Sequence, residues 1–196
     1  MFGKKLRERE RQSVMTLYPP QILHDLNSHH IFLDTGVFIT ASKSESFVDF
    51  LVKLKNDANC SLTTIPSVVF EFTNGSESLE KYNARTESLN SLVDSVNPVT
   101  FLNNIQDFYV VMAKINDQNK SYTDFLLAAC LYNYRRSKIA LLTTDLKAFP
   151  SFYPRTHVVT VEQDRTKAII NLAIYKFDGK GYASAAERAL RENKSE

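Results

Sequence analysis

The strongest constraint on the fold is an alternation of short apolar runs with longer segments whose apolar residues recur at helical spacing. The run "IFLD", residues 31–34, is continuously apolar and ends in a carboxylate, and "KIALLTT", residues 138–144, is similar. Such continuous runs are typical of strands that are covered on both faces. The alternation therefore predicts an α/β fold with a central, mostly parallel sheet and helices on both faces.

The chain divides into three parts on this pattern. Residues 1–29 form a basic N-terminal extension, residues 30–162 hold most of the strand and helix segments, and residues 163–196 form a C-terminal extension. In the last part, residues 168–177 alternate like an edge strand, although a helix is not excluded, and residues 182–193 are Ala-rich and helical in character. Gly179 and Gly181 are expected to form a flexible joint between these two segments.

Composition excludes few function classes. Hydrophobic residues make up 43% of the 196 residues and charged residues 23%, which is a globular balance. The net charge of +2 is too small to prove an anionic partner. We expect a soluble, cytoplasmic protein without a membrane partner, because no apolar run approaches the roughly 20 residues that span a bilayer. The two cysteines have no metal-ligand spacing, so reduced thiols are expected.

Four acidic residues stand where chemistry is expected, and each also has a purely structural interpretation. Asp34 and Asp145 follow strand segments and could cap the next turn or helix. Glu71 is the one acid in the apolar helix "PSVVFEF" and could face solvent. Asp124 follows Ser121 at capping-box spacing.

Taken together, the four acids can converge. Carboxyl ends of parallel strands meet at one edge of a sheet, and the helices that carry Glu71 and Asp124 are expected to pack beside those strands. Clustered carboxylates repel one another and raise each other's pKa unless a cation lies among them. Oxygen ligands of this kind suit Mg²⁺ or Mn²⁺. The sequence therefore predicts a divalent-metal site at this edge.

Four blocks of sequence resemble the PIN-domain family of metal-dependent ribonucleases. In chain order they are "FLDTGVFI", "PSVVFEFTNG", "SYTDFLLAACL" and "ALLTTDLKAF", which lie within residues 30–162. Asp34, Glu71, Asp124 and Asp145 occupy the acidic positions of these blocks. One position departs from the family, because the residue two after the first Asp is often Asn or Ser there and is Gly36 here.

The resemblance implies an endoribonuclease that leaves a 5′ phosphate and a 3′ hydroxyl. It implies Asp34, Asp124 and Asp145 as metal ligands, directly or through water, with Glu71 either binding a metal or orienting the attacking water. Thr35 and Thr143 are expected to hold the carboxylates by hydrogen bonds. Two other functions stay open, namely a structure-specific DNA nuclease and a non-catalytic RNA-binding or assembly module with a degenerate site.

Partners are predicted from residues outside the acidic blocks. In "LYNYRRSK", Arg135 and Arg136 could bind RNA phosphates and Tyr132 could stack on an unpaired base. A solvated helix end with favourable cations explains the same pattern. If the chain is a toxin, it needs an antitoxin protein that blocks the site. The C-terminal helix, residues 182–193, could mediate a homodimer.

Overall fold

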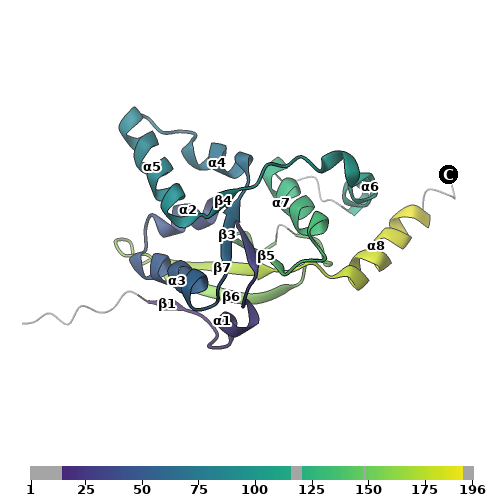
Figure 1. Ribbon diagram of the computed structural model, residues 1–196, viewed down its shortest axis with the longest axis horizontal. Coiled ribbons are helices and arrows are strands. Elements are labelled where there is room, and N and C mark those ends of the chain that lie inside the picture. Colours follow the sequence, from purple (N-terminus) through teal and green to yellow (C-terminus); the bar gives the residue numbers. More distant parts are fainter. Residues whose placement is uncertain (1–14, 116–120, 148, 192–196) are drawn as a thin grey trace, which may run out of the picture.

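The computed structural model describes residues 15–115, 121–147 and 149–191 as a mixed α/β fold (Figure 1). Its strands join one seven-stranded sheet in the order β1-β6-β7-β5-β2-β3-β4. The strands are β1 (Thr16–Leu17), β2 (His30–Leu33), β3 (Ser61–Thr64), β4 (Ser95–Val96), β5 (Ile139–Thr143), β6 (Arg155–Glu162) and β7 (Ile169–Tyr175). The helices are α1 (Ile22–Asp25), α2 (Thr35–Ala41), α3 (Glu45–Asn56), α4 (Pro66–Thr73), α5 (Leu79–Leu92), α6 (Gln106–Ile115), α7 (Tyr122–Asn133) and α8 (Gly179–Arg191), with a short 3-10 turn η1 (Leu102–Asn104).

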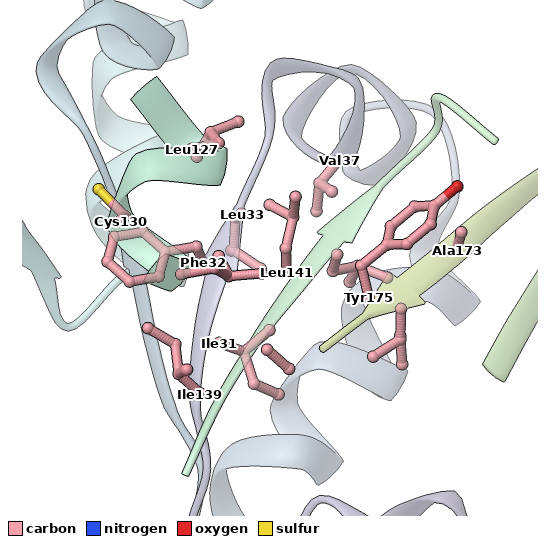
Figure 2. Close-up of a cluster of buried hydrophobic side chains, with 14 of the residues drawn as sticks. Ile31, Phe32, Leu33, Val37, Leu127, Cys130, Ile139, Leu141, Ala173 and Tyr175 are labelled. Carbon is pink, nitrogen blue, oxygen red and sulfur yellow. The ribbon is translucent and has the colours of Figure 1, made fainter. Parts of the chain in front are cut away.

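Four consecutive strands, β5-β2-β3-β4, pair in parallel, as the apolar runs predict. Every residue of β5 is buried, and Ile31 and Leu33 of β2 are fully buried. Figure 2 shows Leu127 and Cys130 of α7 on the side of the strands toward which Phe32 points. Side chains on both faces of β2 and β5 therefore pack in the core, which explains why these runs are continuously apolar.

The other half of the sheet is antiparallel, so the sheet is mixed rather than mostly parallel. Strand β7 lies between β5 and β6 and pairs antiparallel with both, and β1 pairs antiparallel with β6. Residues 168–177 were expected to form an edge strand, yet Leu172, Ala173 and Ile174 are fully buried. Residues 163–168 join β6 to β7 as a hairpin, and a hairpin can only pair its strands antiparallel.

Parts of both predicted extensions belong to this fold. Residues 1–14 lie outside the described residues, but β1 joins the sheet and Ile22 of α1 is fully buried. At the other end, Gly179 and Gly181 lie in the first turn of α8 rather than in a flexible joint. Helix α8 packs on α6 of the same chain, and Lys114 Nζ donates a hydrogen bond of 2.8 Å to the Ala189 carbonyl.

Three helices begin at the edge where the parallel strands end. Helix α2 follows β2 after one residue, Asp34, and α4 follows β3 after one residue, Ile65, and the two helices pack against each other. The first turn of α7 reaches α4 through the contact between Thr123 and Glu71. Both cysteines are free and buried, as expected. Within the described residues, no helix has the length and apolar character needed to cross a membrane.

Candidate functional site

Asp34 connects strand β2 to helix α2. Its backbone is extended, and its Oδ1 accepts a hydrogen bond of 2.6 Å from the Thr35 amide, so it caps α2 as one interpretation of the sequence held. Its Oδ2 accepts a hydrogen bond of 2.6 Å from the hydroxyl of Thr143, which ends β5. Only 8% of Asp34 is exposed. The carboxylate is thus buried between the ends of two neighbouring strands.

The electrostatic environment of Asp34 disfavours its charge. Burial raises the pKa of this carboxyl to about 6, and the two hydrogen bonds from Thr143 and Thr35 offset only part of that effect. The negative charges of Asp124 and Glu71 raise the pKa further. Two further acids, Glu71 and Asp124, therefore affect the pKa of Asp34 at this edge, and Asp34 forms no ion pair with a cationic side chain of the described residues.

Glu71 joins α4 to two other elements. Pro66 starts α4 at the position where a missing amide hydrogen costs nothing, and Glu71 follows in the second turn. Its Oε2 accepts a hydrogen bond of 2.6 Å from the Thr35 hydroxyl, and its Oε1 accepts one from the Thr123 hydroxyl. Sequence reasoning predicted a role for Thr35 but missed Thr123, because a Thr between two capping residues carries no distinctive signal.

Asp124 stands in the first turn of α7 and completes a capping box with Ser121. The Ser121 amide and hydroxyl both donate to Oδ2, at 3.1 and 2.8 Å. No described residue donates to Oδ1. The structural interpretation of Asp124 is thus correct, and the carboxylate still keeps one oxygen for a further ligand.

Asp145 lies two residues beyond the end of β5, and it is exposed. Its amide donates a hydrogen bond of 3.0 Å to the Thr143 hydroxyl oxygen, and its Oδ1 accepts one of 2.8 Å from the Lys147 amide. The second contact closes the turn that the sequence allowed as an alternative. Since Thr143 also donates to Asp34, one hydroxyl group connects the two acids that follow strands.

The hydrogen bonds of the four acids determine which of their oxygens could bind a cation. In the described ranges 15–115, 121–147 and 149–191, no three His, Cys, Asp or Glu side chains lie close enough to hold one ion together. Mg²⁺ often binds through only one or two carboxylates and retains several waters, so it does not need three direct ligands. Within the same ranges, Oδ1 of Asp124 and Oδ2 of Asp145 have no hydrogen-bond donor, and Asp34 carries a buried charge without a cation. The donor set therefore fits a hard divalent cation that is partly hydrated.

Gly36, the departure from the family pattern, has a steric cause in this chain. A Cβ atom at Gly36 would lie 2.0 Å from the Oγ1 and 2.9 Å from the Cγ2 of Thr144. Both distances are shorter than non-bonded atoms tolerate, so a Cβ at this position would force Thr144 to shift. The first turn of α2 therefore lies directly against the segment that joins Thr143 to Asp145.

The predicted RNA-binding residues lie at the opposite edge of the sheet. Arg135 and Arg136 follow α7 and precede β5, so the five residues of β5, about 16 Å of strand, separate them from Asp145. The Arg135 guanidinium stands 4.1 Å from the centre of the Tyr132 ring and donates to the Tyr132 carbonyl at 2.8 Å. The structure therefore does not bring this cluster to the acidic edge, the name used below for the end of the sheet that carries Asp34, Glu71, Asp124 and Asp145.

Tyr132 itself takes part in packing. Its ring stacks on Phe108 with 4.6 Å between centroids and lies 4.9 Å from Tyr182. It thereby connects α7 to α6 and α8, and it is half-buried. The Phe108 ring and the Arg135 guanidinium thus both pack against the Tyr132 ring, which leaves little of its surface for an RNA base.

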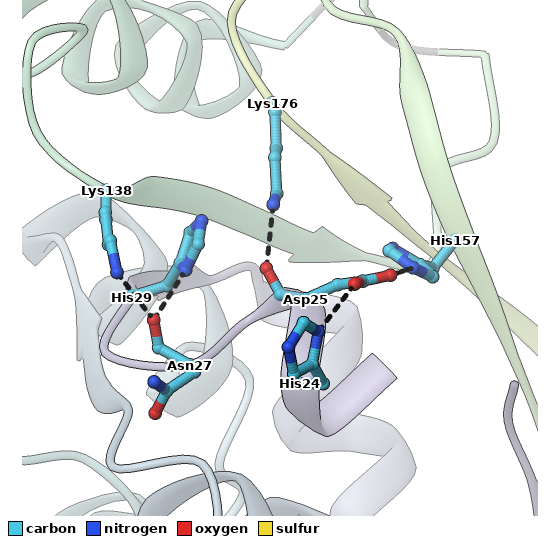
Figure 3. A network of polar contacts seen from close by, with 7 residues as sticks. All are labelled: His24, Asp25, Asn27, His29, Lys138, His157 and Lys176. Carbon is cyan, nitrogen blue, oxygen red and sulfur yellow. Dashed lines mark hydrogen bonds and ion pairs between the residues drawn. The ribbon is translucent and has the colours of Figure 1, made fainter. Parts of the chain in front are cut away.

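Polar residues around α1 form a separate network at this opposite edge. Its members, all labelled in Figure 3, are His24, Asp25, Asn27, His29, Lys138, His157 and Lys176. His157 and His24 contact the Asp25 carboxylate, and these hydrogen bonds lower the pKa of Asp25. Lys176 donates to the Asp25 carbonyl at 3.2 Å. The contacts fix the end of α1 to the sheet, in keeping with a structural role for the histidines.

No family model, curated protein or solved structure matches this chain in comparisons with known proteins. The resemblance to PIN-domain nucleases therefore rests on the four blocks of sequence. The fold adds that Asp34, Glu71 and Asp124 lie at one sheet edge and that Asp145 is connected to Asp34 through Thr143.

Proposed function

We propose that the chain is a divalent-metal-dependent endoribonuclease of PIN-domain type whose active site is the acidic edge. The observation that carries this proposal is the buried carboxylate of Asp34, which has two acidic neighbours and, among the described residues, no ion pair with a cationic side chain. A buried, uncompensated charge is costly in a folded protein, and a cation removes that cost. Perturbed carboxylates of this kind are more frequent at functional sites than elsewhere.

The four acidic residues would have different roles in this reaction. Asp34, Asp124 and Asp145 would hold Mg²⁺ or Mn²⁺ with their remaining oxygen lone pairs, directly or through water. A bound divalent cation lowers the pKa of water and neutralises charge that develops on a phosphodiester. Glu71, which accepts hydrogen bonds on both oxygens as Asp34 does, would either bind the ion or orient the attacking water.

Hydroxyl groups fix the geometry of these acids. Thr143 orients Asp34, Thr35 and Thr123 orient Glu71, and Ser121 orients Asp124. Residues that orient ligands in this way contribute to metal affinity as well as to activity. These hydroxyl donors would hold the acids in place before substrate arrives, which lowers the reorganisation needed for catalysis.

The test is cleavage of a panel of labelled RNAs and DNAs by the purified protein, with Mg²⁺, with Mn²⁺ and with EDTA. We expect RNA cleavage only with metal and 5′-phosphate, 3′-hydroxyl ends. Asp34→Asn and Asp124→Asn should abolish it. Asp49→Asn is the matched control, because Asp49 is an acid of α3 and lies outside the acidic edge.

Each contrary result would indicate a different site or function. Cleavage by Asp34→Asn at the wild-type rate would refute the assignment of the site. Cleavage of DNA alone would indicate the structure-specific DNA nuclease instead. RNA binding without cleavage under any metal would indicate the non-catalytic module.

A further inference from the structure

Two aromatic side chains near the acidic edge are left open to solvent. Phe70 is 66% exposed and Tyr122 is 67% exposed, whereas Tyr82, the next most exposed aromatic side chain of the described residues, is 46% exposed. Neither ring takes part in an aromatic pair with any described residue. Exposure of such rings forgoes the favourable burial of a large apolar surface, so their position calls for an explanation.

Both rings are next to residues that meet at Glu71. Phe70 immediately precedes Glu71 in α4, and Tyr122 immediately precedes Thr123, whose hydroxyl donates to Glu71. Successive helix residues are rotated by about 100°, so each ring stands beside its neighbour's contact rather than over it. The two exposed rings therefore belong to residues that directly precede the two partners of the contact between Glu71 and Thr123, one on α4 and one on α7.

We propose that Phe70 and Tyr122 bind unpaired bases of the nucleic-acid strand whose phosphodiester occupies the acidic edge. This inference rests on the proposed function. A nucleotide whose phosphate lies at the carboxylates carries its base only a short distance away, and flat exposed rings offer a stacking surface for it. Stacking of this kind does not depend on base identity, because every base has a π face.

The arrangement also selects the form of the substrate. Bases in a duplex already stack on their neighbours and cannot turn a face toward a protein ring, whereas bases of a single strand can be splayed apart. The site should therefore prefer single-stranded segments or loops, with weak dependence on sequence. Tyr132, the ring that the sequence suggested for this role, offers less free surface because Phe108 and Arg135 pack against it.

The experiment compares Phe70→Ala and Tyr122→Ala with the conservative variants Phe70→Tyr and Tyr122→Phe. Tyr82→Ala is the matched control, because Tyr82 lies on α5, which holds none of the four acids. Each variant is assayed for kcat and KM on a single-stranded RNA with Mg²⁺, and for Mn²⁺ affinity by calorimetry. Each alanine variant should raise KM about fivefold or more. The conservative variants and the control should match the wild type, and Mn²⁺ affinity should not change.

The outcomes separate this inference from the proposed function. If the wild type cleaves RNA but both alanine variants keep its KM, the inference fails and the nuclease assignment stands. Equal cleavage of duplex and single strand by the wild type also overturns it. A dimer in light scattering that becomes a monomer in Phe70→Ala would show that the rings bind a second copy instead. If the wild type shows no metal-dependent cleavage, the proposed function itself fails.

Discussion

Replacing Asp34 with Asn is expected to stabilise the metal-free protein at neutral pH, although it removes the residue on which the proposed activity most depends. The pKa of Asp34 rises from 3.8 to about 6 on folding, chiefly because of burial. A shift of this size makes the ionised folded state less stable by about 3 kcal/mol, since one pKa unit corresponds to about 1.4 kcal/mol. The Thr143 hydroxyl then faces a neutral amide and loses about 1 kcal/mol of hydrogen bonding, which leaves a net gain of about 2 kcal/mol.

The sign of the pH dependence follows from linkage. Because the folded-state pKa is above the unfolded-state value, the folded protein binds the Asp34 proton more tightly. This contribution to stability is fully present below about pH 4 and is lost as the pH rises through about 6. The amide of the Asp34→Asn variant has no proton to lose, so the stability difference between variant and wild type should grow between about pH 4 and pH 6 and stay constant above about pH 7.

The assay is urea unfolding of both proteins in EDTA, followed by circular dichroism from pH 4 to pH 8. In a thermal unfolding scan, the same gain of about 2 kcal/mol should raise the melting temperature of a domain of this size by about 4–8 °C. Asp49→Asn controls for the loss of one negative charge. Added Mg²⁺ should shrink or reverse the difference, because the ion binds the folded wild type but not the variant. An Asp34→Asn protein that is less stable than the wild type at pH 7.5 in EDTA would refute this reasoning.

Two further predictions concern the surroundings of the site. Gly36→Ala should lower the free energy of unfolding by about 1–3 kcal/mol, because the new Cβ overlaps Thr144, and Gly36→Ala/Thr144→Gly should recover most of that loss in the same urea assay. Joint replacement of Arg135 and Arg136 with Ala should weaken RNA binding at low salt and flatten its salt dependence, while kcat stays unchanged because these residues lie at the far edge. A drop in kcat would place them closer to the chemistry than the fold does.

The parallel half of the fold was predictable from sequence because burial on both faces produces continuous apolar runs. Strands β2 and β5 carry that signal, and their carboxyl ends could be placed together without any knowledge of loops. The antiparallel half was not predictable in the same way. The alternation in residues 168–177 suggested an edge strand, whereas the exposure of Ile169 and the burial of Ile174 show a strand that enters the sheet interior along its length.

The candidate site was predictable as a set of residue types but not as a set of contacts. Asp34, Asp124 and Asp145 also fulfil the capping and turn roles that each had as an alternative, so the structural and functional interpretations of a residue do not exclude each other. The distance of Arg135 from the acidic edge could not be inferred from its short sequence distance to Asp124. A 12-residue helix nevertheless carries the chain about 18 Å away from its first turn.

Binding of Mn²⁺ to the purified wild-type protein tests the central claim most directly, namely that Asp34, Asp124 and Asp145 hold one partly hydrated cation, directly or through water. Isothermal titration at pH 7.5, where Asp34 is already ionised, should show saturable binding, and at about pH 5.5 the binding should also release protons because Asp34 must then ionise. Asp34→Asn should lose this binding, and Asp49→Asn should retain it. Equal Mn²⁺ affinity in Asp34→Asn and wild type, or no saturable binding to the wild type, would contradict the account.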